Sequence, residues 1–209
     1  MSDPTNPTTG PARHPELVAW LAERLRAFPH WADHAGGTDL FDFTPASLGV
    51  LDDLIRETFD DADDIDSATR LGDFVQGAVW YVGEMMCRTH GMVWRYTPEP
   101  LDDGTSPPLF DPEDTPALDT PSVAFPGAAP HEGFYPLNIL RRMLLDEDET
   151  GVPVDDRLVD VLDPDYLKDG EPPPGTTAGT RVGHQSLLAD VPNLPALNDR
   201  RAQVGESDP

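Results

Sequence analysis

Apolar residues recur at steps of three and four along residues 68–90, which is the period of an amphipathic helix. Trp80 and Tyr81 widen the apolar face, so we expect this helix to be buried on more than one side. Ser67 is placed to cap the start of the helix, and Gly91 is placed to end it. The other apolar positions of the face are Leu71, Phe74, Val75, Ala78, Val79, Val82, Met85 and Met86.

The period changes from three or four to two directly after this helix. Met92, Trp94 and Tyr96 alternate with their neighbours, which predicts a strand over residues 92–97. A second short strand is predicted at residues 122–125, and we expect the two strands to pair.

Further helical periods flank these elements. Thr44-Pro45 supplies a capping hydroxyl followed by proline at the first helical position, and Pro15 and Pro136 suit the first turns of two more helices. The pattern predicts an α+β fold, with three or four helices packed on a small antiparallel sheet in one domain over residues 14–163. The additional helices are expected at 15–28, 45–59, 136–145 and, more weakly, 156–162.

Three segments are rich in proline, glycine and acidic residues and carry little helical or strand period. They predict a disordered lead at 1–13, an acidic loop at 98–121 and a mostly disordered tail at 164–209. Leucines at 184–197 leave docking of that stretch on the domain or on a partner as an alternative.

The charge balance narrows the class of partner. The chain has 39 acidic against 14 basic residues, a formal net charge of −25 and a pI near 4.2. Phosphate backbones and anionic membrane surfaces would be repelled, so nucleic acid and membranes are not expected partners. Three origins of the acidity stay open: a solvated acidic surface, attraction of a basic protein, and adaptation of a proteome to high salt.

Cellular location and redox chemistry are predicted from what the sequence lacks. The first residues contain no apolar signal-peptide core, and no stretch reaches 18 apolar residues, so we expect a cytoplasmic protein. The single cysteine, Cys87, cannot form an internal disulfide and is expected to be a buried, inert thiol.

Two patterns in the sequence offer possible metal ligands. His30 and His34 are spaced i, i+4, as zinc-binding histidines on helices are, and Glu84 and His90 are candidate further ligands. Because the metalloprotease glutamate after the first histidine is missing, a structural or surface role is favoured. The acidic run Asp61, Asp63 and Asp64 offers calcium-type oxygens but lacks the glycine and distal glutamate of an EF-hand, so it is interpreted as a solvated turn. No cofactor is expected.

Glu84 is the most informative polar residue of the central helix. Its apolar neighbours indicate partial burial, so it needs a partner. Arg88 at i+4 is one, and anchorage of the neighbouring strand through Arg95 or backbone amides is another. Because no nucleophile or second carboxylate is spaced to work with it, catalysis is not expected. The possible ligand or structural cluster is Trp80, Tyr81, Glu84 and Trp94, with a core role favoured for its aromatic members.

Residues 45–146 resemble small bacterial α+β domains of unknown function. In those domains a helix with small residues, an aromatic residue and a glycine–glutamate pair runs into a glycine turn and a tryptophan-bearing strand. The matching positions are Gly77, Ala78, Tyr81, Gly83, Glu84, Gly91 and Trp94. The resemblance implies an immunity or accessory protein near secreted-toxin loci and brings no catalytic residue.

These observations predict a cytoplasmic, non-enzymatic binding module whose acidic surface meets a basic protein. The alternative is a metal-dependent hydrolase that uses His30, His34, Glu84 or His90. A salt-adapted domain whose charge has no partner is a third hypothesis.

Overall fold

The structure is a computed structural model that describes residues 14–66, 71–98, 104–105, 108–110, 120–129, 132–145 and 155–169. The predicted lead, the cap at Ser67, the stretch 184–197, most of the acidic loop and the tail beyond residue 169 lie outside these residues. The described elements form an α+β fold, which confirms the predicted class. Within this part of the chain, no helix combines the length and hydrophobicity needed to cross a bilayer.

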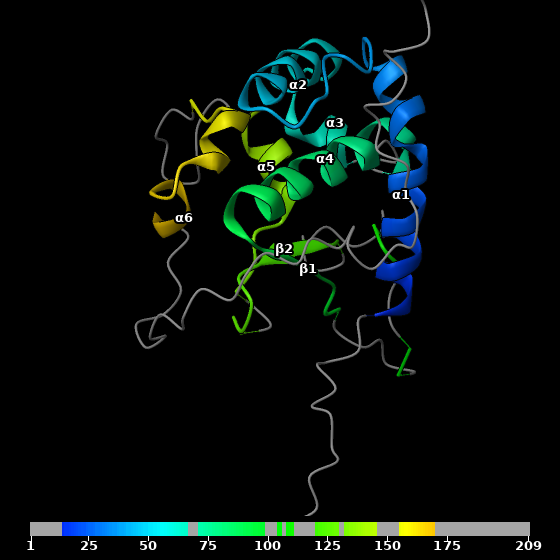
Figure 1. Cartoon of the computed structure of the whole chain (residues 1–209), viewed down its shortest axis with the longest axis vertical. Helices are drawn as coiled ribbons and strands as arrows, with labels where there is room; N and C mark the ends of the chain where they lie inside the picture. The colour runs from blue at the N-terminus through cyan, green and yellow to red at the C-terminus, as the bar shows by residue number, and fades with distance from the viewer. Residues whose placement is uncertain are drawn as a thin grey trace, which may run out of the picture. The chain divides into compact units, whose positions relative to one another are not determined.

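Helix α4, Asp73–His90, is the central element (Figure 1). It contacts helix α1 (Pro15–His34), helix α5 (Pro136–Arg142), the 3₁₀ helix η3 (Leu158–Leu162) and both strands. Its residues from Gly77 to Met86 are buried without interruption. Gly91 ends the helix at φ 69°, where its N–H donates to the Cys87 carbonyl over 2.9 Å. The predicted C-cap is therefore confirmed, since glycine adopts this left-handed conformation without steric cost.

The start of α4 lies later than the sequence pattern predicts. Gly72 is the N-cap in extended conformation, and Leu71, expected on the buried face, is 47% exposed. The first helical residue, Asp73, accepts a hydrogen bond from the buried Arg24 of α1 over 3.1 Å. A carboxylate in the first turn also suits the positive end of the helix dipole.

Helix α1, Pro15–His34, continues past Pro29, where the prediction ended it at residue 28. The extension places Trp31 in the core, where its indole Nε1 donates to the Phe74 carbonyl over 3.1 Å. Burial of this large side chain offsets the roughly 3 kcal/mol that an internal proline costs a helix. Val18, an apolar residue of the same helix, is 49% exposed.

Helix α2, Pro45–Thr58, begins at the predicted proline. The Thr44 hydroxyl does not cap it; that hydroxyl donates to the Asp42 carboxylate over 2.7 Å. The acidic run that was interpreted as a solvated turn is largely helical: Asp63 and Asp64 lie in the first turn of a short helix, α3 at Ala62–Asp66, where carboxylates suit the positive end of the helix dipole.

The sheet contains β1, Val93–Arg95, and β2, Ser122–Ala124, which pair antiparallel as predicted but are shorter than expected. The Cα partners are Val93 with Ala124, Trp94 with Val123, and Arg95 with Ser122. The Arg95 guanidinium donates to three carbonyl oxygens, those of Phe125, Ala128 and Ala129, at 2.6–3.2 Å. These bonds hold the turn after β2 against β1.

The C-terminal elements are α5 at Pro136–Arg142, η3 at Leu158–Leu162 and α6 at Tyr166–Asp169. The weak helix predicted at 156–162 is therefore a 3₁₀ helix. Its start is set by the Asp160 carboxylate, which accepts the Arg157 N–H over 2.8 Å. Helix α6 lies just beyond the predicted domain boundary at 163 and contacts η3.

Candidate functional site

Two glycines of α4 lie under indole rings. A Cβ added at Gly77 would collide with the indole of Trp31, and one added at Gly83 would collide with the indole of Trp94. The rings approach the helix backbone this closely because neither position has a side chain. These glycines of the resembled motif are therefore required for packing.

Glu84 of α4 faces Trp94 of β1, the tryptophan whose indole lies over Gly83. The Trp94 Nε1–H donates to Glu84 Oε1 over 2.9 Å, and Arg88 Nε lies 3.6 Å from Glu84 Oε2. The carboxylate is only 7% exposed. Of the two predicted roles, pairing with Arg88 is present, and the strand is anchored through Trp94 where Arg95 or backbone amides were expected.

Tyr81 joins α4 to the start of α2. Ser47 Oγ–H donates to the Thr44 carbonyl over 2.6 Å, so the adjacent Tyr81 hydroxyl is assigned as the donor to Ser47 Oγ. The phenol oxygen in turn accepts the Phe43 N–H over 2.9 Å. Burial raises the pKa of the Tyr81 phenol above its ordinary value, and the hydrogen bond that the phenol oxygen accepts from the Phe43 N–H opposes that rise.

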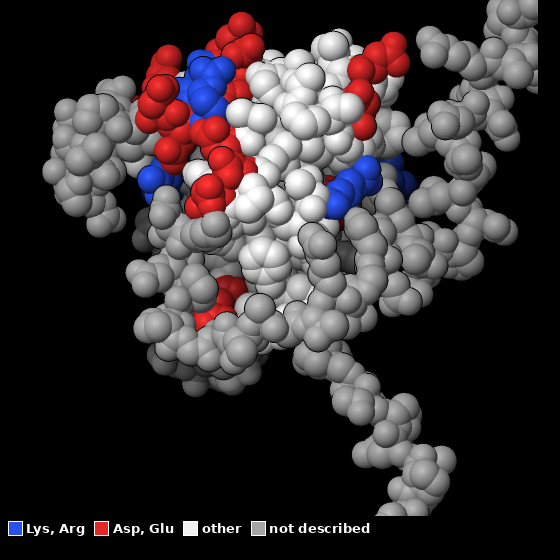
Figure 2. All heavy atoms as spheres, turned by 60° about the vertical axis from the view of Figure 1, so that its left-hand side comes forward, with Lys and Arg blue, Asp and Glu red and all other residues white. Residues whose placement is uncertain are grey.

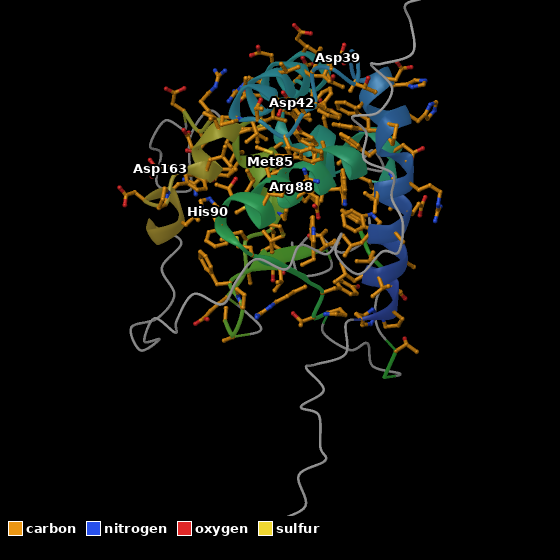
Figure 3. The ribbon with its side chains drawn as sticks, viewed as in Figure 1. Asp39, Asp42, Met85, Arg88, His90 and Asp163 are labelled. Atoms are coloured by element: carbon orange, nitrogen blue, oxygen red, sulfur yellow. The ribbon has the colours of Figure 1, made fainter. Side chains whose placement is uncertain are left out.

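Arg88 and Phe43 form a contact that the sequence analysis missed. The guanidinium carbon of Arg88 lies 3.4 Å from the centroid of the Phe43 ring, which stacks on Tyr81 at 4.8 Å. Phe43 adopts a positive φ of 62°, which is rare for an aromatic residue. Figure 3 labels Arg88 on α4 and Asp42 in the segment that leads into α2. No local sequence signal connects these segments.

The residues of the predicted cluster all lie in the interior. Trp80 packs against Phe28, with ring centroids 5.3 Å apart. The polar groups of Tyr81, Glu84 and Trp94 have partners within the chain, as given above. This arrangement holds α4, α2 and β1 together and offers a ligand no ring face at the surface, since all four residues are buried.

The structure does not gather the proposed metal ligands into one site. His30 and His34 are exposed on α1, and His90 Nε2–H donates to the Val161 carbonyl of η3 over 2.9 Å. Glu84 is bound by Trp94, as above. Among the described residues, no three histidine, cysteine or acidic side chains lie close enough to hold a metal ion.

The acidic residues after α2 form hydrogen bonds at the start of α3. Asp61 Oδ1 accepts the Asp64 N–H over 3.1 Å, and Asp64 Oδ2 accepts the Asp60 N–H over 3.0 Å. These bonds are typical of carboxylates at the start of a helix, here α3. Cys87, expected to be buried, is half-buried.

Asp52 of α2 is a buried carboxylate to which the sequence analysis gave no role. It is 1% exposed, and its two carboxylate oxygens accept from Arg56 Nε over 2.8 Å and from the Leu158 N–H over 2.9 Å. Arg157 Nε lies 3.3 Å away. Its position in the sequence could have indicated this burial: Asp52 follows Leu48 by four residues and so lies on the apolar face of α2.

Exposed carboxylates gather on α2, α3 and the segment around η3, and we call this set the acidic surface. These segments are neighbours, because α2 contacts η3 and the Arg56 guanidinium donates to the Asp156 carbonyl over 2.8 Å. Figure 2 shows acidic side chains crowded around a small group of basic ones. The acidic surface comprises Asp53, Glu57, Asp60, Asp61, Asp63, Asp64, Asp155, Asp163 and Asp165.

The arginines near the acidic surface are engaged in ion pairs. Arg56 pairs with Asp52, and Arg142 pairs with Asp156 over 2.7 Å. Arg157 lies within 3.6 Å of Asp53 as well as near Asp52. The exposed carboxylates of the acidic surface outnumber these three arginines, so the surface keeps a negative potential.

Comparison with known proteins gives no assignment: the chain matches no family model, no curated protein and no solved structure.

Proposed function

We propose that this protein is a non-enzymatic binding module whose acidic surface meets a basic protein, as an immunity or accessory protein would. The observation that carries the proposal is the gathering of exposed carboxylates on neighbouring elements in a chain of net charge −25. Complementary charge accelerates encounter and selects the partner.

The buried polar groups favour binding over catalysis. Glu84 and Asp52, the two buried carboxylates of the described residues, both accept hydrogen bonds from within the fold. A general base needs reach to a substrate, and these bonds direct both groups inward. The separation of the proposed ligands likewise gives the hydrolase alternative no support in the described part of the chain.

The test is a binding experiment with a charge-matched control. The full chain is used as bait in lysate at low and at moderate salt, and bound proteins are identified and purified. The variant Glu57→Gln/Asp60→Asn/Asp63→Asn removes three carboxylates of the acidic surface. The control Glu16→Gln/Asp33→Asn/Asp39→Asn removes the same charge from α1 and the segment after it.

We expect a basic partner whose affinity falls as salt rises. The first variant should bind it about tenfold more weakly, at roughly 0.5 kcal/mol per exposed pair, whereas the control should bind as the wild type does. A partner that binds both variants equally, or whose affinity is insensitive to salt, contradicts the proposal.

A further inference from the structure

His30 and His34 form an exposed pair at the C-terminal end of α1. The helix continues through both residues, so the i, i+4 spacing places them on one side, and their ring centroids are 4.1 Å apart. Both side chains are exposed to solvent. Two imidazoles at this separation need only small side-chain rotations to direct one nitrogen each at a shared ion.

The hydrogen bond of His34 selects its tautomer. His34 Nδ1 lies 2.9 Å from the His30 carbonyl oxygen, which can only accept, so Nδ1 carries the proton. In the neutral ring this leaves the lone pair on Nε2. Histidines that bind metals commonly donate the other ring N–H to a carbonyl in this way, which fixes the ring and raises its basicity as a ligand.

The electrostatic surroundings also favour a cation. His34 lies in the last turn of α1, where the helix dipole is negative, and the exposed carboxylate of Asp33 is its neighbour in the chain. The net charge of −25 raises the local concentration of any cation.

We propose that His30 and His34 form a two-nitrogen site for a divalent transition-metal ion of the zinc, copper and nickel class. Imidazole suits these ions, whereas Mg²⁺ and Ca²⁺ take oxygen ligands. Water completes the coordination, so the site is open and lies on the surface. It is independent of the proposed acidic surface and does not include Glu84 or His90.

Zn²⁺ is the probe for the test, titrated into the full chain by calorimetry. Excess Mg²⁺ is present so that carboxylates are occupied by the harder ion. The variants are His30→Gln and His34→Gln, each of which keeps one imidazole. The control is His184→Gln, because no other histidine lies within four residues of His184. Imidazole proton NMR signals, assigned through the variants, provide a second readout.

We expect a Zn²⁺ site that persists in Mg²⁺. Its affinity for Zn²⁺ should fall at least tenfold in either variant but not in the control. Removing only a group that hydrogen-bonds to a metal ligand already costs about tenfold in metal affinity, so removing a ligand should cost at least as much. The signals of His30 and His34 should shift together in the wild type. No Zn²⁺ binding in Mg²⁺, or binding that both variants retain at full affinity, overturns the proposal. If a variant melts at a lower temperature, the paired NMR shift in the wild type decides.

Discussion

At the scale of single residues, the interior of this protein is organised by indole rings that lie directly on helix backbone. Trp31 and Trp94 reach α4 from opposite directions in the chain, one from α1 and one from β1. Each needs a glycine beneath it. Such close contact leaves no room for even one added methyl group, since protein interiors are packed like molecular crystals.

Alanine at these glycines should therefore destabilise the fold. We expect Gly77→Ala and Gly83→Ala to lower the free energy of unfolding by about 1–3 kcal/mol through overpacking. Gly49→Ala, in α2 with no atom near its added Cβ, is the control and should raise it by roughly 0.5–1 kcal/mol. Urea unfolding followed by tryptophan fluorescence measures all three; equal effects at Gly49 and Gly83 would contradict the packing argument.

The buried bond between Glu84 and Trp94 predicts a difference between two substitutions. Glu84→Gln keeps an acceptor for the indole N–H and should cost less than about 1 kcal/mol. Glu84→Leu leaves that N–H buried without an acceptor and should cost about 1–3 kcal/mol. In the Trp94→Phe background the penalty of Glu84→Leu should shrink, and a double-mutant cycle from thermal melts measures the difference.

Tyr81 predicts a loss of stability in alkali. Burial raises its pKa in the folded state, so the folded protein is more stable when the phenol is neutral than when it is ionised. That contribution is complete below the unfolded pKa of about 10 and is lost as pH rises through the folded pKa. Tyr81→Phe should flatten the decline in stability between about pH 9 and 11. Part of the decline should remain, because burial also raises the pKa of Tyr135 and Tyr166; an unchanged slope rules out the assignment to Tyr81.

At the scale of elements, η3 is a short segment fastened to the core at both ends. Asp52 of α2 accepts its first N–H, and His90 at the end of α4 donates to the Val161 carbonyl. Leu158 and Val161 are fully buried between these bonds. A 3₁₀ helix of five residues has little stability of its own, so these contacts determine where it lies.

Asp52→Ala should release η3 more than it unfolds the rest of the protein. The substitution removes the acceptor for Leu158 N–H and the partner of Arg56, at a cost of about 2 kcal/mol. Hydrogen exchange should accelerate at residues 158–162 before it does in α4. Asp53→Asn changes the neighbouring, 74% exposed carboxylate and should leave this exchange unchanged. Uniform acceleration throughout the chain would indicate global unfolding instead.

At the scale of the whole molecule, like charges oppose compaction. A net charge of −25 repels itself, and screening by salt weakens that repulsion, because the Debye length falls from about 30 Å at 0.01 M to about 8 Å at 0.15 M. A protein whose acidic surface serves binding should fold at low salt, whereas a protein adapted to high salt should need molar salt to fold.

We expect the melting temperature to rise as NaCl increases from about 0.01 to 0.15 M, with most of the gain complete by then. The Glu57→Gln/Asp60→Asn/Asp63→Asn variant should show a smaller rise. Scanning calorimetry measures both proteins. A chain that folds only in molar salt would instead support the salt-adapted hypothesis and remove the reason to seek a basic partner.

The sequence by itself determined the local elements. The period of residues 68–90, the glycine at 91, the prolines at 45 and 136 and the alternation after residue 92 predict a central helix, its end, two further helix starts and a strand. The structure confirms these elements, although the central helix begins only at Asp73. These signals succeed because capping and side-chain periodicity act between residues a few positions apart.

Tertiary structure alone decided what each face packs against. Helix α1 continues through Pro29 because Trp31 finds a place on Gly77, 46 residues away by number, and Asp52 is buried because Leu158 supplies its donor. A periodic pattern reports that a face is apolar, but not which segment covers it. Long-range partners therefore fixed the end of α1, the buried carboxylates and the grouping of acidic side chains, whereas short-range chemistry fixed the elements themselves.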